Sequence, residues 1–209
     1  MAGRGHMSRE VIVDEAQRLA AERGTAALTF QALAATLGVS KQAIIYWYPS
    51  KWELLRDVAV RGLRAEADST AAAVRDARSA PEAIERFVRA LIGFHLADLG
   101  RFRMLYLATQ FDRRAAPPGP VGKVLGPIHQ TTSAMYAALE SRIAADPPFV
   151  GGENPRRLAV AAHMAGIGLI TMLALADSVQ DPMAHDTGAL VDSLVALLTA
   201  RGKGVETDG

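Results

Sequence analysis

The feature that most constrains this chain is a short turn, Gly38-Val39-Ser40, between two apolar segments with helical spacing. The first segment is predicted to be a helix from Phe30 to Leu37, with Thr29 accepting free backbone amides at its start. Gly38 supplies the left-handed residue that ends it, and Ser40 can cap a second helix from Lys41 to about Tyr48. Two helices joined in this way form a helix-turn-helix, whose second helix can enter the major groove of DNA.

Helical periodicity continues on both sides of the turn, and no segment alternates like a strand. A first helix can begin at Ser8 and stop at Gly24, and Ser50 can cap a long one that reaches about Ala73. Further helices are predicted at Pro81–Leu99, Arg101–Asp112, Ile128–Ala144, Pro155–Ala176 and Thr187–Arg201, the last capped by Thr187. The predicted loops are Ala115–Pro127, Asp146–Glu153 and Asp177–Asp186. We therefore expect an all-α protein.

Composition and charge exclude several classes of site. The chain has no cysteine, so disulfides, thiolate metal sites and cysteine nucleophiles are excluded. The formal net charge is +1, and residues 1–60 hold seven Lys/Arg against six Asp/Glu. Global charge thus gives little support for nucleic-acid binding, which must rest on local placement. The sequence contains no nucleophile elbow, P-loop or zinc-protease motif, so we expect no enzyme and no cofactor.

The predicted helix from Lys41 needs one face for the core and another for DNA. Val39, Ile44 and one of Trp47 or Tyr48 are expected to anchor it. The residues left on the opposite face are Lys41, Gln42, Ala43 and Tyr46. Glutamine can bond an adenine edge, alanine can touch a thymine methyl, and lysine can reach guanine or phosphate. The alternative is that the aromatic residues are plain core side chains of a helical domain.

The spacing of these residues resembles that of a known family. The pattern comprises Ile12-(x3)-Ala16-(x2)-Leu19-(x4)-Gly24, then Leu28-Thr29-(x3)-Leu33-Ala34-(x2)-Leu37-Gly38-Val39-Ser40, then Tyr48-Pro49-Ser50-Lys51-(x2)-Leu54-Leu55. It resembles the TetR family of one-component regulators over roughly a quarter of the chain. The resemblance implies a homodimer on a palindromic operator, and a second domain whose small-molecule ligand releases the DNA.

The resemblance also implies DNA-contacting residues. Thr29, Gln31 and Lys51 match the family's phosphate-contacting positions. The positions facing the groove are Ser40, Lys41, Gln42, Ala43, Tyr46 and Trp47. Where the family usually has Leu-Tyr, this chain has Ile44-Ile45, so a customary phosphate-contacting tyrosine is missing. Tyr46 or Tyr48 could replace it. Taken alone, Lys51 would be an ordinary solvated lysine.

The second domain is predicted from periodicity alone. Leu158 to Ala176 is nineteen residues without a formal charge, near the length that spans a bilayer. It is rich in Ala and Gly and carries His163 and Thr171, which favours a buried helix of a bundle. With the apolar helix Thr187–Arg201, the helix Pro155–Ala176 could pair with its copy across a two-fold axis. The alternative is that both helices are core of a monomer.

An effector pocket should be mostly apolar with a few polar groups, and methionines suit a flexible hydrophobic ligand. The candidate lining residues are Phe87, Leu91, Phe94, His95, Met104, Tyr106, Phe111, Ile128, Met135, His163, Met164 and Met172. Any one of them could instead be core packing. A metal site formed by His95, His129 and His163 is conceivable, but we expect three separate hydrogen-bonding histidines and no metal.

The sequence thus predicts four parts: residues 1–7 as a leader or cloning remnant, 8–50 as a DNA-binding domain, 51–201 as a ligand-sensing and dimerisation domain, and 202–209 as a disordered tail. The expected function is that of a cytoplasmic, ligand-responsive repressor, without a membrane segment. An activator, a repressor without a ligand, a helical scaffold and an enzyme on a helical fold are the alternatives. Neither the ligand nor the operator can be read from the sequence.

Overall fold

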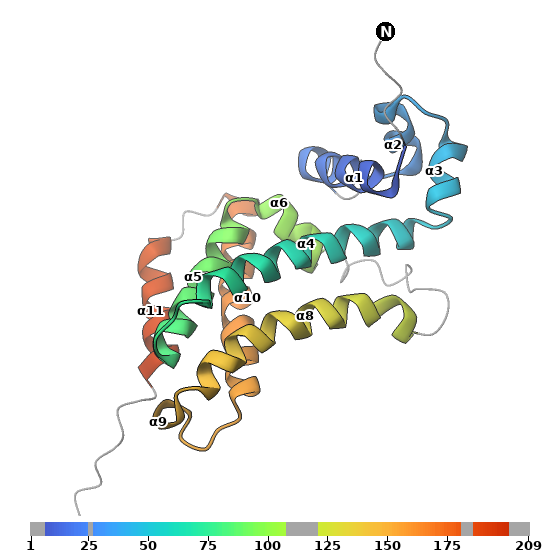
Figure 1. The fold of residues 1–209 in the computed structure, drawn as a ribbon. Helices are drawn as coiled ribbons and strands as arrows, with labels where there is room; N and C mark the ends of the chain where they lie inside the picture. The colour runs from blue at the N-terminus through green and yellow to red at the C-terminus, as the bar shows by residue number, and fades with distance from the viewer. Residues whose placement is uncertain (1–6, 25–26, 108–120, 181–185, 201–209) are drawn as a thin grey trace, which may run out of the picture. The chain divides into compact units, whose positions relative to one another are not determined.

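The chain is described here from a computed structural model, which covers residues 7–24, 27–107, 121–180 and 186–200 (Figure 1). These ranges contain helices and turns and no strand, which confirms the predicted all-α fold. The predicted leader and tail lie outside them, except for Met7. The chain divides into two compact units: unit 1 comprises residues 1–64 and 98–129, and unit 2 comprises residues 65–97 and 130–209.

Three short helices open unit 1: α1 (Arg9–Arg23), α2 (Phe30–Leu37) and α3 (Lys41–Trp47). Each begins at a predicted capping hydroxyl, because Ser8, Thr29 and Ser40 accept the backbone amides of Val11, Ala32 and Ala43 at 3.0 to 3.3 Å. Gly38 ends α2 in the left-handed conformation, with φ 66°. The predicted helix-turn-helix is therefore present, with its helices bounded within one residue of expectation.

The core of unit 1 forms where these helices meet the start of α4 (Lys51–Val74) and the short α6 (Leu99–Phe102). Its fully buried side chains are Ile12, Ala16, Leu19, Leu28, Leu33, Ile44, Tyr48 and Leu54. Met104 and Leu105, in the π-helical turn η2 (Arg103–Leu107), are also buried in it. A continuous apolar core thus holds α3 by one face.

Helix α4 buries a row of residues at intervals of four, which is close to the turn of an α-helix. The row consists of Leu54, Val58, Gly62, Glu66, Thr70 and Val74. The residues up to Arg64 belong to unit 1, and those from Ala65 belong to unit 2. Glu66 is the one charged residue in the row, and none of it is exposed.

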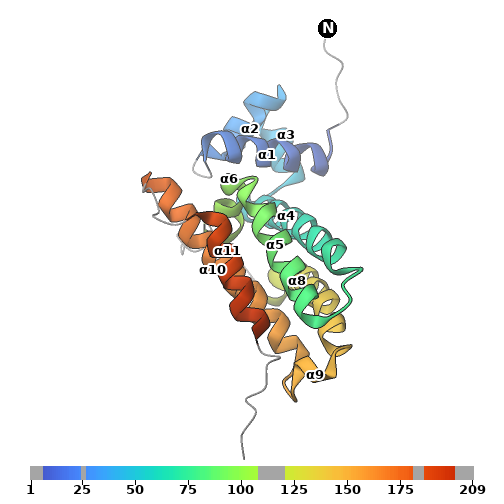
Figure 2. The same ribbon diagram turned by 90° about the vertical axis from the view of Figure 1, so that its left-hand side faces the viewer.

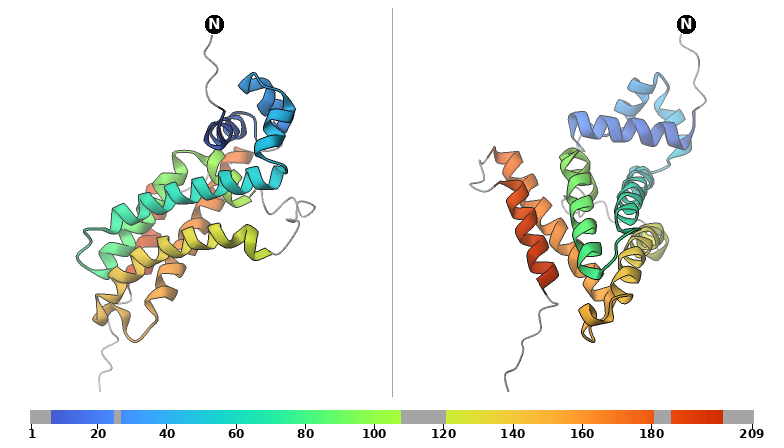
Figure 3. Two further views of the ribbon diagram at one scale, coloured as in Figure 1. Left: turned by 45° about the vertical axis from the view of Figure 1, so that its right-hand side comes forward. Right: turned by 60° about the vertical axis from the view of Figure 1, so that its left-hand side comes forward.

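Unit 2 is built around α5 (Ala80–Leu96), which packs against both α10 (Pro155–Val179) and α11 (Thr187–Thr199) (Figures 2 and 3). Phe87 and Leu91 of α5 are buried, and Leu91 lies where a side chain at Gly166 of α10 would collide with it. Helix α8 (Val121–Ala144) adds buried Leu139 and Ile143. Pro81 lies in the first turn of α5, as predicted, behind the cap Ser79.

Two helices are longer than the sequence predicted. Helix α8 begins at Val121, so residues 121–127 of the predicted loop are helical and Pro127 lies inside the helix. A proline removes one amide donor but does not prevent turns from forming on both sides of it. Helix α10 continues through Asp177 to Val179, because polar residues on the solvent side do not stop a helix. It ends at Gln180, which takes the left-handed conformation with φ 53°.

Four further segments differ from expectation. Helix α5 ends at Leu96 rather than at the predicted Leu99. The predicted loop Asp146–Glu153 contains a short helix, α9 (Pro147–Val150). Asp186, rather than Thr187, caps α11, because its carboxylate accepts the amide of Ala189, and the helix stops at Thr199. The predicted helix Arg101–Asp112 is instead α6 followed by η2, and residues 108–112 lie outside the described part. These errors concern the ends of elements and leave their order intact.

Helix α10 is the one helix of the described residues whose length and apolar composition would allow it to cross a membrane. Its buried residues include Ala159, Ala162 and Ile170, and the helix packs against α5 and α11. Packing of this kind is that of a core helix in a helical bundle, as the sequence predicted.

Candidate nucleic-acid interface and effector site

Helix α3 presents one face to solvent and holds the other in the core of unit 1. Lys41 and Gln42 are exposed at its first turn, and Tyr46 is 80% exposed one turn later. Ile44 is fully buried, and Val39 and Trp47 pack partly buried against the same core. An exposed polar face on a well-anchored helix is what reading a DNA groove requires.

The C-terminal end of α3 is held by a cluster of polar contacts. Arg9 of α1 donates to the Trp47 carbonyl oxygen at 3.0 Å, and its guanidinium lies 4.7 Å from the centre of the Tyr48 ring. The Tyr48 hydroxyl donates to Asp57 of α4 at 3.0 Å. Burial, together with the Asp57 charge, raises the pKa of Tyr48. Tyr48 is thus an anchor, and only Tyr46 is left of the two tyrosines that could replace the family's missing one.

The other candidate DNA contacts also belong to unit 1. Thr29, Gln31, Ser40 and Lys51 are exposed, at the starts of α2, α3 and α4. The hydroxyls of Thr29 and Ser40 are engaged in capping. Ala43 and Trp47 are half-buried, and the Trp47 ring meets Tyr46 edge-on, with ring centres 5.7 Å apart. The candidate residues therefore lie on α3 or at the first turns of its neighbours.

The candidate effector residues are divided between the units. Six belong to unit 2: Phe94 is half-buried, and Phe87, Leu91, His95, Met135 and His163 are buried. Met104, Tyr106 and Ile128 belong to unit 1, and Phe111 lies outside the described residues. Met164 and Met172 are 66% and 59% exposed on α10, so the structure does not bring them into the unit 2 cluster.

A buried polar network runs through the unit 2 cluster. Glu66 accepts from His95 Nε2 through Oε2 and from His163 Nε2 through Oε1, each at 3.1 Å. A carboxylate has no proton to give, so both imidazoles donate. His163 Nδ1 lies 3.0 Å from the Tyr136 hydroxyl and accepts a hydrogen bond from it when the ring is neutral. The network therefore connects α4, α5, α8 and α10.

The network fixes the charge state of its carboxylate. Burial alone would raise the pKa of Glu66, but the hydrogen bonds from His163 and His95 outweigh it and hold the pKa at about 2. Burial also raises the pKa of Tyr136, and the nearby Glu66 charge adds to this effect. Glu66 is thus a fixed negative charge at neutral pH, which makes it unsuitable as a general acid.

Sequence reasoning missed Glu66 and Tyr136, and it treated the histidines as separate. The structure joins His95 and His163 through Glu66, whereas His129 is exposed on the unit 1 part of α8. Among the described residues, no group of three His, Asp or Glu side chains could hold a metal ion. A signal for the network was available in the sequence: Glu66 is the one charged residue among the six residues of α4 that follow one another at intervals of four from Leu54 to Val74.

Several solved structures share the fold of the whole chain. A regulatory protein of the tetR family from Rhodococcus RHA1 has a TM-score of 0.66 at 19% identity, covering 97% of this chain and 100% of its own. FadR from Bacillus subtilis, solved in complex with stearoyl-CoA, has a TM-score of 0.69 at 16% identity, covering 94% of this chain and 100% of its own. The fatty acid degradation regulator FadR from Bacillus halodurans has a TM-score of 0.66 at 16% identity, covering 97% of this chain and 98% of its own. No curated protein sequence matches the chain significantly.

A capped and exposed third helix on a three-helix core, followed by a helical body, is the architecture typical of DNA-binding regulators of the helix-turn-helix class. Residues 12–58 match the family described as bacterial regulatory proteins, tetR family. The predicted resemblance to the TetR family is thus confirmed over this N-terminal segment, and the rest of the chain shares the fold of the tetR-family regulator above. Members of this family bind DNA and small-molecule effectors, are typically dimers, and are not enzymes.

Proposed function

We propose that this chain is a cytoplasmic, ligand-responsive repressor that releases its operator when a small hydrophobic molecule binds. Residues 8–50 bind DNA, and residues 51–201 bind the effector and form a homodimer. The two α3 helices of the dimer occupy successive major grooves of a palindromic operator. The observation that carries the proposal is the exposed polar face of α3, anchored by the fully buried Ile44.

The DNA-reading role is tested with the double variant Lys41→Ala, Gln42→Ala. A matched control removes an exposed cation and an exposed amide from unit 2, as Arg157→Ala, Gln130→Ala. We expect the wild type to bind particular genomic fragments, more weakly at higher salt. Each lost base contact is worth about 1–3 kcal/mol, so the variant should lose sequence preference and the control should keep it. A folded wild type without salt-sensitive DNA binding would contradict the proposal.

Tyr46 is proposed to contact a phosphate through its hydroxyl. Its side chain is the most exposed large apolar one in the described part of the chain, so neither folding nor the core requires it. Tyr46→Phe should weaken binding to all DNA sequences about equally, because a phosphate contact carries no sequence information. A change of sequence preference in this variant would instead assign Tyr46 to base contacts.

The exposed face of α10 supports the homodimer. Small and apolar side chains follow one another there at spacings of four, three, four, three and four residues: Ala161, Ala165, Gly168, Met172, Leu175 and Val179. Residues at an average interval of 3.5 form the seam along which two helices pack. Met164 on α10 is also exposed, and Leu197 on the neighbouring helix α11 is 76% exposed. A second copy of the chain would cover this face.

The dimer is tested by placing charges on this face. Met172→Glu together with Leu197→Glu should convert the dimer into a monomer, because two like charges would be buried at each contact. Sedimentation velocity measures the mass, and circular dichroism checks that the helices remain. As a matched control, Gln130→Glu together with Arg157→Glu changes exposed residues off the seam and should leave a dimer. A wild-type monomer at micromolar concentration would contradict this part of the proposal.

The effector site is proposed around the Glu66 network, because polar groups surrounded by apolar side chains fix the orientation of a hydrophobic ligand. The complex of Bacillus subtilis FadR with stearoyl-CoA supports a search among long-chain acyl compounds. A ligand that exchanges hydrogen bonds with Tyr136 or His163 would reach Glu66 on α4. Helix α4 begins four residues after α3 ends, so a small movement of α4 shifts α3 against grooves about 34 Å apart.

Gel shifts test release from DNA. Acyl-CoA thioesters of increasing chain length are added to the preformed complex, with free CoA as the control for the polar part. The proposal is supported if release from DNA increases with chain length and is altered in Tyr136→Phe. A ligand that binds the DNA-free state more tightly than the DNA-bound state by a few kcal/mol is enough to empty the operator. If no hydrophobic compound ever weakens DNA binding, the repressor works without an effector at this site.

A further inference from the structure

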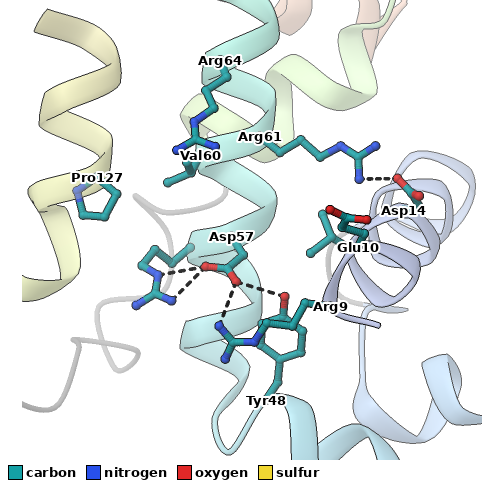
Figure 4. A pocket seen from close by; sticks show the side chains of 11 residues that line it. Arg9, Glu10, Asp14, Tyr48, Asp57, Val60, Arg61, Arg64 and Pro127 are labelled. Carbon is teal, nitrogen blue, oxygen red and sulfur yellow. Dashed lines mark hydrogen bonds and ion pairs between the residues drawn. The ribbon is translucent and has the colours of Figure 1, made fainter. Parts of the chain in front are cut away.

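Unit 1 contains a cavity of about 650 Å³ that the proposed function does not use (Figure 4). Its walls are formed by α1 and α4, with Pro127 of α8 at one side. Four arginines and three carboxylates line it, together with the apolar side chains of Val13 and Val60. A cavity with both charged and apolar walls fits an amphiphilic molecule better than an inorganic ion.

Three of the four arginines are held by carboxylates. Asp57 accepts from Arg56 Nε at 3.1 Å and from its NH2 at 2.9 Å, and lies 3.6 Å from Arg9. Arg61 forms an ion pair with Asp14 of α1. Arg64 is exposed and has no ion pair or hydrogen bond with any described residue. Glu53, which is not part of the lining, also lies 3.7 Å from Arg9, so Arg64 is the one lining arginine without a carboxylate partner among the described residues.

The arrangement along α4 determines where an anion would lie. Arg56, Val60 and Arg64 follow one another at intervals of four, so they share one face of the helix. Figure 4 shows the Arg64 guanidinium beside Val60, on the side of Pro127. Val60 is 9% exposed, so the surface between the two cations is apolar. An anionic group at Arg64 would thus have an apolar wall directly beside it.

We propose that this cavity binds an organic anion, with a carboxylate or phosphate group at Arg64 and an apolar body against Val60 and Pro127. Arginine presents several N–H donors in a plane, which matches both kinds of oxyanion. The site is separate from the proposed effector site of unit 2. It depends neither on DNA binding nor on release, and it remains testable if both of those proposals fail.

The test uses the full chain without DNA and titrates it with octanoate, octyl phosphate and octan-1-ol by calorimetry. We expect both anions to bind and the alcohol to bind at least tenfold more weakly, because it lacks the charge. Arg64→Gln should reduce the affinity for the anions about tenfold, and Arg64→Lys should lose less because the charge remains. Arg157→Gln removes an exposed arginine of α10 and should bind like the wild type.

The comparison of the two anions identifies the chemical class. Tighter binding of octyl phosphate points to phosphorylated ligands, and tighter binding of octanoate points to carboxylic acids; either result supports the site. The proposal is overturned if neither anion binds, if octan-1-ol binds as tightly as the anions, or if folded Arg64→Gln binds like Arg157→Gln. Circular dichroism of each variant confirms folding, which the exposure of Arg64 leads us to expect.

Discussion

The interiors of the two units differ in how they treat charge. Unit 1 encloses apolar side chains such as Ile12, Leu33 and Ile44, and keeps its ionic contacts, among them Arg9 with Asp57, at the surface. Unit 2 instead encloses the Glu66 carboxylate, with no exposed surface, between two imidazoles. An apolar core needs only the right pattern and volume, whereas a buried charge needs specific partners at hydrogen-bond distance.

This difference between an apolar core and a buried charge determines which substitutions each unit tolerates. In unit 1, the exposed residues of α3 can change without disturbing the core, because the helices are held by their capping and core residues. In unit 2, the polar network joins four helices, so a change at one member alters the hydrogen bonding of the others. Such a network is a liability for stability and, for the same reason, a suitable place to sense a ligand.

The largest effect is expected from Glu66→Ala, which leaves two imidazoles without their shared acceptor. Breaking a buried ionic network in this way typically costs about 3–5 kcal/mol. Glu66→Gln should cost less, because the amide can bond both rings if one imidazole changes its tautomer. Urea unfolding at fixed protein concentration measures both values. Equal stability of Glu66→Ala and the wild type would contradict the conclusion that unit 2 depends on its buried charge.

Acid should expose the same contrast. The pKa of Glu66 is about 2 in the folded chain against 4.5 for the unperturbed group, so below pH 4.5 the unfolded chain takes up a proton that the folded chain does not. The stabilisation by the charge, on the order of 3 kcal/mol, is present above pH 4.5 and is lost as the pH falls toward 2. The stability difference between wild type and Glu66→Gln should therefore shrink from pH 5 to pH 3. A constant difference would argue against a lowered pKa of Glu66 in the folded chain.

A smaller effect is expected when one tyrosine hydroxyl is removed from each unit. Tyr48→Phe leaves Asp57 with Arg56 and Arg9, so we expect a loss of about 0.5–1 kcal/mol. Tyr136→Phe removes the partner of His163 Nδ1 in a partly buried site and should cost about 1–2 kcal/mol. Chemical denaturation of both variants gives the comparison. The reverse order would mean that the unit 2 network adjusts more easily than the contacts of unit 1.

The smallest effect is a gain. Gln180 ends α10 with φ 53°, a conformation that glycine adopts without the strain of a side chain. Gln180→Gly should raise stability by up to about 1 kcal/mol without changing DNA binding. Thermal unfolding and a gel shift measure the two quantities, and Gln130→Gly within α8 serves as the opposite control, which should destabilise.

The order of helices followed from the sequence because their starts depend on local contacts. Ser8, Thr29, Ser40 and Ser79 cap helices through their own hydroxyls, which depend on nothing distant in the chain. The failures have two causes. Asp186 caps α11 by an equally local contact with Ala189, one residue before the predicted Thr187, so that error is a choice between two adjacent candidates. Pro127 lies inside α8, against the usual preference of proline.

The candidate sites divide in the same way. The exposed face of α3 was predictable, since Ile44 and Tyr46 lie on opposite sides of a short helix. The sequence did not predict which tyrosine anchors the helix, because Tyr48 is held by Asp57, nine residues away, and by Arg9. The Glu66 network joins residues up to 97 positions apart, so the sequence marked His95 and His163 as candidates without indicating that they meet at Glu66.

The buried row of α4 has a consequence for how sequences of this kind can diverge. One inserted residue turns the remainder of a helix by about 100°, which would take Glu66 off the row that begins at Leu54. Substitutions in α4 change one contact at a time, whereas an insertion or deletion changes every contact that follows. Evolution should therefore vary the length of relatives in their loops and leave the distance from Leu54 to Glu66 unaltered. A designer who joins unit 1 to the second unit of another protein must likewise keep the helical register of α4, because the boundary between the units lies within this helix.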